Sequence, residues 1–457
     1  MSHNLYPPGP RTWPPIRLFW QMQRNTLPFL EGMARDYGDI SYCRVGPRDI
    51  YLLNHPDFIH DVLVTNDRKF AKSLGLQRAK RLLGEGLLTS EGDYHLHQRR
   101  LMQPLFHRRQ ITAYGASMVK HAARLCDDQA EQGWQDGATL NMHAQMMQLT
   151  LGIIGETLFQ QDITGEAQKV GVAMETLTRN FRRLLSPLAP LQDRLPTAEN
   201  RRLRQSEAEL ERIVAHLISE RRTQGGDQDL LSLLLMAHTN NDGASPMSNR
   251  QIRDEVLTLL LAGHETTANA LTFTWWLLAQ HPPVAKKMQQ ELDAVLGGHL
   301  PTVDDLEQLR YTRMVLAEAM RLYPPVWVIG RQALAEHTVG GYTIPAGATV
   351  LMSQWIMHRD ARYYPAPQRF DPERWTPAAM ATRPKFSYFP FGGGSRLCIG
   401  EHFAWMEGVL LLATLAQSWE VQLVNDTPLA LRPAITLRPQ QGVPLIVRRR
   451  ASATSLV

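Results

Sequence analysis

The strongest constraint on the fold is one long helical run over residues 248–280. It opens with Ser248 and Gln251 in the spacing of a capping box, and the pair His281-Pro282 ends it. At 1.5 Å per residue, these 33 residues span about 50 Å, which is enough to cross a whole domain. A helix of that length must be largely buried. Polar residues at its middle, such as Glu265 and Thr266, therefore need an explanation.

The composition is that of an ordinary globular protein, and it excludes several classes. Hydrophobic residues make up 44% of the 457 residues and charged residues 20%, which excludes a disordered, collagen-like or disulfide-stapled chain. A chain of this length can bury a large core and also enclose a cofactor. The net charge of +5 is too small to indicate binding of nucleic acid.

The cysteines and the N-terminus bear on the cell compartment. Cys43, Cys126 and Cys398 form neither a disulfide framework nor a zinc-ligand spacing, which favours a reducing cytoplasm. The first 25 residues contain five prolines and no continuous apolar run, so we expect neither a signal peptide nor a transmembrane anchor. The most apolar helical stretch carries ionisable residues at its middle. We therefore expect a soluble, cytoplasmic protein.

The rest of the chain reads as mainly helical, with short strands towards both ends. Apolar segments on either side of residues 46–49, Gly-Pro-Arg-Asp, predict a strand hairpin. Prolines within residues 185–200 predict a loop between two helices. The other expected elements are helices within residues 99–235, 310–323 and 401–415, a strand–turn–strand unit over 342–352, an irregular segment over 360–397, and strands over 431–449.

The most informative segment is residues 391–400, Phe-Gly-Gly-Gly-Ser-Arg-Leu-Cys-Ile-Gly. Its glycines let the backbone turn tightly and approach a flat, bulky group. Cys398 stands just before a helix, where backbone N–H groups favour the thiolate that binds metals. A single thiolate suits a metal that four other ligands already hold, such as haem iron. The alternative is a glycine-rich turn beside an inert buried cysteine.

This segment resembles the haem-binding loop of the cytochrome P-450 family of haem-thiolate monooxygenases. The pattern Phe-x-x-Gly-x-Arg-x-Cys-x-Gly matches at Phe391, Gly394, Arg396, Cys398 and Gly400. The resemblance implies that Cys398 is the proximal ligand of the iron. It also implies that Arg396 faces a haem propionate and that Phe391 and Gly400 contact the cofactor.

A second resemblance concerns a helix and the segment that follows it. Glu318 and Arg321 stand three residues apart, so they share one face of the predicted helix over residues 310–323. The pair matches the Glu-x-x-Arg motif of the family, and Asp371-Pro-Glu-Arg-Trp375 resembles its Pro-Glu-Arg-Phe segment. By resemblance, Arg374 completes a structural Glu–Arg–Arg network. The alternative is an exposed helix pair that adds a few tenths of a kcal/mol.

The polar middle of the long helix provides the third match. Residues 262–267, Ala-Gly-His-Glu-Thr-Thr, resemble the family's (Ala/Gly)-Gly-x-(Asp/Glu)-Thr-Thr pattern. By this resemblance, Glu265 and Thr266 form the acid–alcohol pair that delivers protons. Thr266 can instead bond the carbonyl four residues back. His264 occupies the variable position, so we expect a core or surface histidine. The alternative for the pair is a polar face towards solvent.

A fourth set of residues is assigned to the haem propionates. Residues 91–106 resemble the family's C helix, in which Trp-x-x-x-Arg holds a propionate, and here His95 replaces the Trp and Arg99 follows at the fourth position. Arg331, after a Pro-Pro pair, is the third candidate. A buried dianionic edge needs several such partners. The alternative is a basic helix face towards solvent.

The resemblance covers nearly the whole chain and implies its fold. We expect the triangular cytochrome P-450 fold, mainly α with a smaller β region, formed by residues 1–457 as a single domain. The β-rich parts are expected at about residues 36–60, 330–357 and 431–449. Haem b would lie between the long central helix and the helix that follows the cysteine loop.

The resemblance also implies the reaction. The enzyme would insert one oxygen atom of O₂ into a C–H bond, or a C=C bond, of a lipophilic small molecule. NAD(P)H-derived electrons would come from a separate ferredoxin or flavodoxin with its reductase, because only 59 residues follow Cys398. We expect a monomer that binds no nucleic acid. By resemblance, the substrate pocket includes five mostly apolar positions, Leu87, Ala262, Val326, Val328 and Ile435.

The pocket's apolar character predicts a fatty acid, terpenoid, carotenoid, steroid or polyketide as substrate, with some likeness to bacterial members that oxidise long lipids or carotenoids. Two other functions remain. One is a peroxide-driven haem-thiolate peroxygenase, although such members often lack the acid–alcohol pair seen at Glu265 and Thr266. The other is a non-catalytic haem-thiolate sensor, although no sensor or DNA-binding appendage is visible.

Overall fold

The computed structural model of the chain describes residues 6–10, 16–127, 129–130, 133–184, 192, 194–225, 230–239 and 247–450. Helices dominate, and the strands form small sheets, which confirms the predicted fold class. Residues 185–191 and 193 of the predicted loop over residues 185–200 lie outside the described residues.

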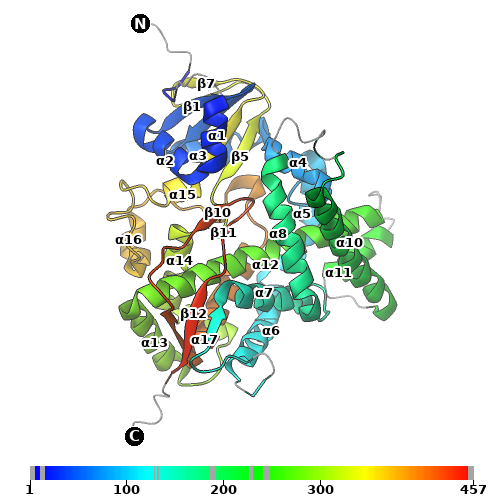
Figure 1. Cartoon of the computed structure of the whole chain (residues 1–457), viewed down its shortest axis with the longest axis vertical. Helices are drawn as coiled ribbons and strands as arrows, with labels where there is room; N and C mark the ends of the chain where they lie inside the picture. The colour runs from blue at the N-terminus through cyan, green and yellow to red at the C-terminus, as the bar shows by residue number, and fades with distance from the viewer. Residues whose placement is uncertain are drawn as a thin grey trace.

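The long helix is present and central. Helix α12 (Asn249–Gln280) crosses the middle of the molecule in Figure 1, and most of its side chains are buried. The predicted capping box is present, because Ser248 Oγ accepts the N–H of Gln251 at 3.2 Å and Gln251 Oε1 accepts the N–H of Ser248 at 2.6 Å. Both bonds satisfy N–H groups that have no partner inside the helix. Local sequence thus sets where α12 begins.

Four helices pack against α12 or against its neighbours and form the main core, α6 (Arg108–Cys126), α7 (Met142–Leu158), α14 (Arg310–Leu322) and α17 (Glu401–Ser418). The other helices are α1 (Ile16–Arg24), α2 (Thr26–Tyr37), α3 (Pro56–His60), α4 (Leu74–Leu83), α5 (Gly92–Met102), α8 (Ala167–Leu184), α10 (Ala198–Gln224), α11 (Leu230–Thr239), α13 (Pro282–Leu296), α15 (Gln354–Met357) and α16 (Pro377–Ala381). In the part of the chain that the structure describes, no helix is both long and apolar enough to cross a bilayer.

The largest sheet has five strands in the order β1-β2-β8-β5-β3. They are β1 (Ile40–Val45), β2 (Arg48–Leu53), β8 (Thr349–Met352), β5 (Ile329–Ala333) and β3 (Phe70–Lys72). Strands β1 and β2 pair antiparallel, as the hairpin prediction required, and β2 pairs parallel with β8. In Figure 1 this sheet lies at the N-terminal end of the molecule, beside α1 and α2. The N-terminal and the C-terminal parts of the chain therefore share one sheet.

The expected strand–turn–strand unit over residues 342–352 is corrected in its pairing. A turn is present, with Gly347 at φ 84°, but β7 (Tyr342–Ile344) pairs with β6 (His337–Val339), while β8 pairs with β2 and β5. Val350 and Met352 of β8 are fully buried, so this strand takes a central place in the large sheet. A turn signal marks a change of direction, and burial decides which strands pair.

The remaining strands lie partly outside the β-rich ranges that the sequence predicts. Strands β10 (Leu431–Pro433) and β11 (Leu437–Pro439) form a short hairpin. Strand β12 (Pro444–Arg449) pairs with β4 (Thr139–Asn141) and β9 (Trp419–Leu423). Strands β3, β4 and β9 were not expected, because three- to five-residue strands carry too little alternation to be recognised.

Candidate active site

The cysteine loop runs from the 3₁₀ turn η8 (Gly394–Arg396) to the first turn of α17. The N–H of Cys398 donates to the carbonyl of Phe391 at 3.0 Å and closes the loop. Gly394 has φ 69°, and a Cβ there would lie 1.8 Å from the carbonyl oxygen of Leu63, so the position requires glycine. The loop is thus shaped by its glycines, as the sequence predicts.

Cys398 is exposed by its surface area, although enough protein atoms surround its thiol to desolvate it. Burial raises the pKa of this thiol above its ordinary value. A hydrogen bond from the backbone of Gly400 and the charge of Arg99 lower the pKa by less. Backbone N–H groups therefore lower the pKa of the thiol, as the sequence predicts, but burial raises it by more. A metal that binds the sulfur would deprotonate the thiol outright.

Three cations gather beside the cysteine loop around one carboxylate. Arg396 donates to Glu91 Oε2 at 2.6 Å and to the carbonyl of Phe70 at 2.9 Å. The backbone N–H of Lys72 also donates to Glu91. Burial, and then the charge of Arg396, lower the pKa of Arg331 to about 10, and burial lowers the pKa of Lys72 to about 7. Among the described residues, only Arg396 forms an ion pair with Glu91, which leaves Arg331 without an ion-pair partner.

His95 and Arg99 lie next to this cluster on α5. His95 is buried, its Nδ1 lies 3.3 Å from Ser90 Oγ and 3.4 Å from Lys72 Nζ, and its Nε2 makes no hydrogen bond. Burial, and then the charge of Lys72, lower the pKa of His95 to about 4. Arg99 donates to the carbonyl of Leu397 at 2.7 Å, next to the cysteine. The structure therefore places His95 and Arg99 inward rather than on a face towards solvent.

At the middle of α12, the predicted acid and alcohol do not contact each other. The hydroxyl of Thr266 donates to the carbonyl of Ala262 at 2.9 Å. The carboxylate of Glu265 is 3% exposed and accepts the hydroxyl of Thr436 at 2.6 Å. His264 is a core residue, because its Nδ1 contacts the carbonyl of Leu260 and burial lowers its pKa to about 4. Side chains at adjacent helix positions point about 100° apart, which explains why Glu265 and Thr266 bind different partners.

Of the predicted pocket residues, Ala262 lies on α12 and Leu87 is hydrogen-bonded to it. Ala262 is exposed on a helix that is otherwise mostly buried. Leu87 is buried, and its N–H donates to Glu255 Oε2 of α12 at 2.9 Å, while its carbonyl accepts Lys72 Nζ at 2.8 Å. Glu255 lies two turns before Ala262, so Leu87 and Ala262 border the same stretch of α12.

The other predicted pocket residues lie on two segments that hydrogen bonds join. Val326 and Val328 flank Trp327, whose Nε1 donates to the carbonyl of Ala434 at 3.0 Å. Ile435 follows Ala434 at the tip of the β10–β11 hairpin. All three apolar side chains are half-buried. The structure thus brings residues 326–328 and the hairpin tip together.

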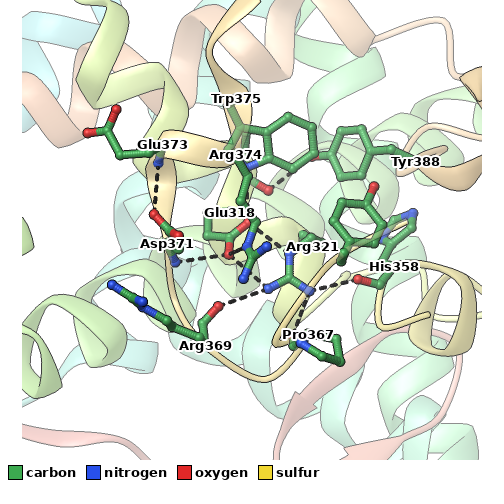
Figure 2. Close-up of polar contacts among 12 residues, drawn as sticks. Glu318, Arg321, His358, Pro367, Arg369, Asp371, Glu373, Arg374, Trp375 and Tyr388 are labelled. Carbon is green, nitrogen blue, oxygen red and sulfur yellow. Dashed lines mark hydrogen bonds and ion pairs between the residues drawn. The ribbon is translucent and has the colours of Figure 1, made fainter. Parts of the chain in front are cut away.

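The Glu–Arg–Arg residues converge around one buried carboxylate, as Figure 2 shows. Arg321 donates to both oxygens of Glu318 at 2.8 Å, and both side chains are fully buried. Arg374 Nε lies 3.4 Å from Glu318 Oε1. The Nε1 of Trp375 and the N–H of Asp371 each donate to Glu318 at 3.0 Å. An exposed helix pair is therefore the wrong description of Glu318 and Arg321.

Arg321 also fixes the irregular segment that follows. It donates to the carbonyls of His358 and Pro367 at 2.7 Å and of Arg369 at 3.1 Å (Figure 2). Sequence reasoning assigned no role to Trp375, which here donates to the same carboxylate that the arginines hold. An indole in place of the expected phenyl ring was the available signal, because a buried Trp needs an acceptor.

Three further residues were missed. Lys72 is one of eight lysines in the chain, and no motif marks it. Arg438 lies 3.9 Å from Glu265 and comes from the C-terminal hairpin, for which no sequence motif exists. Glu407 is fully buried on α17, which packs against α12, and burial raises its pKa to about 8.

The comparison with known families decides the identity. A family model described as cytochrome P450 matches residues 7–445. The chain belongs to the cytochrome P450 family. This confirms the resemblance, and cytochromes P450 carry haem iron as their cofactor.

The residues around Cys398 fit a haem. Haem b carries two propionates, and the buried Arg331 beside the Arg396–Glu91 pair has no ion-pair partner among the described residues. A dianionic edge would relieve the repulsion among these cations, and a propionate would give the Nε2 of His95 a partner. Cys398 supplies the thiol that the iron of this family requires.

Curated relatives add the enzyme class. Cyclooctat-9-en-7-ol 5-monooxygenase of Streptomyces melanosporofaciens is 38% identical over 412 residues, which are 89% of this chain and 87% of the relative. Pentalenene oxygenase of Streptomyces avermitilis is 34% identical over 439 residues, 94% and 96% of the two chains. Carotene epsilon-monooxygenase of Arabidopsis thaliana is 28% identical over 450 residues, 93% and 82%. The chain is a cytochrome P450 monooxygenase, as the sequence predicts.

Proposed function

We propose that this cytochrome P450 inserts one oxygen atom of O₂ into a C–H or C=C bond of a terpenoid. One observation carries the proposal, which is the exposed Cys398 beside Arg396, Arg331 and the buried His95, groups that suit the propionates of a haem. Terpenoids are preferred among the predicted lipophilic classes because two of the reported relatives are named for cyclooctat-9-en-7-ol and pentalenene.

The chain's own residues bind and orient the cofactor. Cys398 Sγ would bind the iron as a thiolate, while Phe391 and Gly400 shape the loop that carries it. Arg396 and Arg331 would hold the propionates, with His95, Arg99 and Lys72 beside them. When bound, haem supplies the activation of O₂ and the transfer of one oxygen atom.

Residues of α12 would handle protons and substrate. Thr266 lies one turn beyond the exposed Ala262, and its hydroxyl donates to the carbonyl of Ala262. In this position the hydroxyl oxygen can orient a proton donor. Glu265 is the ionisable group nearest in sequence that can hold and give the proton. Apolar side chains of Leu87, Val328 and Ile435 would exclude water from the substrate.

We further propose that a separate ferredoxin or flavodoxin, with its NAD(P)H-dependent reductase, supplies the electrons. The support is the family itself, whose members generally take electrons from redox partners.

All three cysteines are free, which supports the predicted cytoplasmic location and leaves Cys398 for the iron.

The test has two stages on the purified holoenzyme. Terpenoid hydrocarbons and alcohols are first screened for a high-spin shift of the Soret band, with fatty acids and steroids as comparison sets. Each hit is then incubated with NADPH, a ferredoxin and its reductase, or with hydrogen peroxide alone. Product formed only with the electron-transfer chain supports the proposal. Product formed only with peroxide would assign a peroxygenase instead, and shifts confined to fatty acids would reject the terpenoid class.

A further inference from the structure

The carboxylate of Glu265 is held by the β10–β11 hairpin. Its Oε1 accepts the hydroxyl of Thr436 at 2.6 Å, and Arg438 Nη1 lies 3.9 Å from the same oxygen. All three side chains are buried. Thr266, the neighbour of Glu265 in sequence, directs its hydroxyl to Ala262 instead. The partners of the acid thus come from a segment about 170 residues away.

The hairpin tip that carries Thr436 is itself fixed in place. The N–H of Ala434 donates to the carbonyl of Thr436 at 3.1 Å. Trp327 Nε1 donates to the carbonyl of Ala434 at 3.0 Å, and the N–H of Leu437 donates to the carbonyl of Pro325 at 2.8 Å. Thr436 is therefore held at a defined position relative to α12, and so is the oxygen that it binds.

Charge reinforces this arrangement. A carboxylate is costly to bury as an anion without a partner of opposite charge, and Arg438 Nη1 lies 3.9 Å from Glu265 Oε1. The nearest titratable neighbour on α7 is His143, whose Nε2 contacts Asn269 Oδ1 at 3.1 Å. Burial, and then the charge of Arg438, lower the pKa of His143, so the imidazole stays neutral. Arg438 therefore supplies the positive charge that Glu265 faces.

We propose that Thr436 is a positioning residue for proton delivery, which acts by holding the carboxylate of Glu265. The inference rests on the proposed monooxygenase function and deepens it. Because the tip that carries Thr436 also carries the pocket residue Ile435, the hairpin joins the substrate pocket to the proton donor. The position of Glu265 is thus set from the substrate side of the molecule rather than by α12 alone.

A double-mutant cycle on the holoenzyme tests this role. The variants are Thr436→Val, Glu265→Gln and the pair together, with Thr274→Val as the matched control. Thr274 is a buried threonine of α12 whose hydroxyl bonds only the carbonyl of Ala270, at 2.7 Å, among the contacts described. Measured quantities are haem content, substrate Kd from the Soret shift, kcat, and the free energy of unfolding of each variant.

We expect Thr436→Val to lower kcat at least threefold while substrate Kd stays within twofold, and Thr274→Val to leave both unchanged. The double variant should be no slower than Glu265→Gln alone, because Thr436 acts only through Glu265. The unfolding cycle should show a coupling of about tenfold in the folding equilibrium constant, as for a hydrogen bond to a carboxylate.

Additive losses of kcat in the double variant would overturn the inference, and so would an unchanged kcat in Thr436→Val. Coupling in unfolding without coupling in kcat would mean that the contact is structural only, which also rejects the positioning role. If the wild-type holoenzyme turned over no substrate with the electron-transfer chain, the proposed function would fail first. The unfolding cycle would still report whether Thr436 holds Glu265.

Discussion

Replacing the carboxylate of Glu318 by an amide should destabilise the protein strongly. Glu318 is fully buried and accepts hydrogen bonds from Arg321, Asp371 and Trp375, and Arg374 forms a further ion pair with it. In Glu318→Gln, the volume is kept, but the buried guanidinium of Arg321 loses its counter-charge. The carbonyls of three other residues still accept from Arg321, so its hydrogen bonds are only partly lost.

The size of the effect follows from these contacts. Removing one partner of a buried ion pair costs about 3–5 kcal/mol. An unfolding entropy of about 2.1 cal/mol/K per residue amounts to about 1 kcal/mol/K for a chain of this length. We therefore expect the Tm of Glu318→Gln to fall by about 3–5 °C. Arg374→Gln should cost less, because Arg374 Nε lies 3.4 Å from Glu318 and Glu318 keeps its closer ion pair with Arg321 in this variant.

Thermal unfolding followed by circular dichroism, with haem content from the ferrous–CO spectrum, measures this effect. The matched control is Glu373→Gln, which removes an exposed carboxylate paired with Lys287 in the same segment. That change should cost about 0–1 kcal/mol. If Glu318→Gln lost no more stability and haem than Glu373→Gln, the network around Glu318 would have to be a weak, solvated one, and the reasoning from burial would be refuted.

Three further predictions concern the active site and its surroundings. Cys398→His should abolish the red-shifted Soret band of the ferrous–CO complex, and a retained band would remove Cys398 as the iron ligand. Thr266→Ala should keep haem and substrate binding but lower the product formed per NAD(P)H oxidised, with hydrogen peroxide released instead; unchanged coupling would make Thr266 a packing residue. Glu407→Gln should flatten the dependence of unfolding free energy on pH. The pKa of Glu407 is raised from 4.5 to about 8, so stability falls as pH rises between these values in the parent protein, and an equal slope in the variant would contradict this assignment.

Much of the fold was readable from local patterns. The capping box at Ser248 and the turn at residues 46–49 were predicted, and the structure contains both, because neighbours in sequence decide them. The strands β3, β4 and β9 were not predicted. Each is three to five residues long and exists because a distant strand pairs with it, which a short window of sequence does not reveal.

The candidate site likewise contains residues that local motifs predict and residues that only the folded chain brings together. Motifs predicted Cys398, Arg396 and the Glu318–Arg321 pair, since each lies within a few residues of the others in its motif. Lys72 carries no motif, and its place beside Arg331 follows from the pairing of β3 with β5. Trp375 was visible as a departure from the family's Phe, but its hydrogen bond to Glu318 required the folded segment.

The sequence by itself determined the types of chemistry and the long helix that carries part of it. A glycine-rich turn before Cys398, and an acid next to an alcohol on α12, are local facts of the chain. Only the tertiary structure decided the partners. Glu265 binds Thr436 rather than Thr266, and Arg396 pairs with Glu91, because folding brings groups from distant segments within a few ångströms. A buried polar group takes whichever partner packing places within reach, and packing is a property of the whole chain.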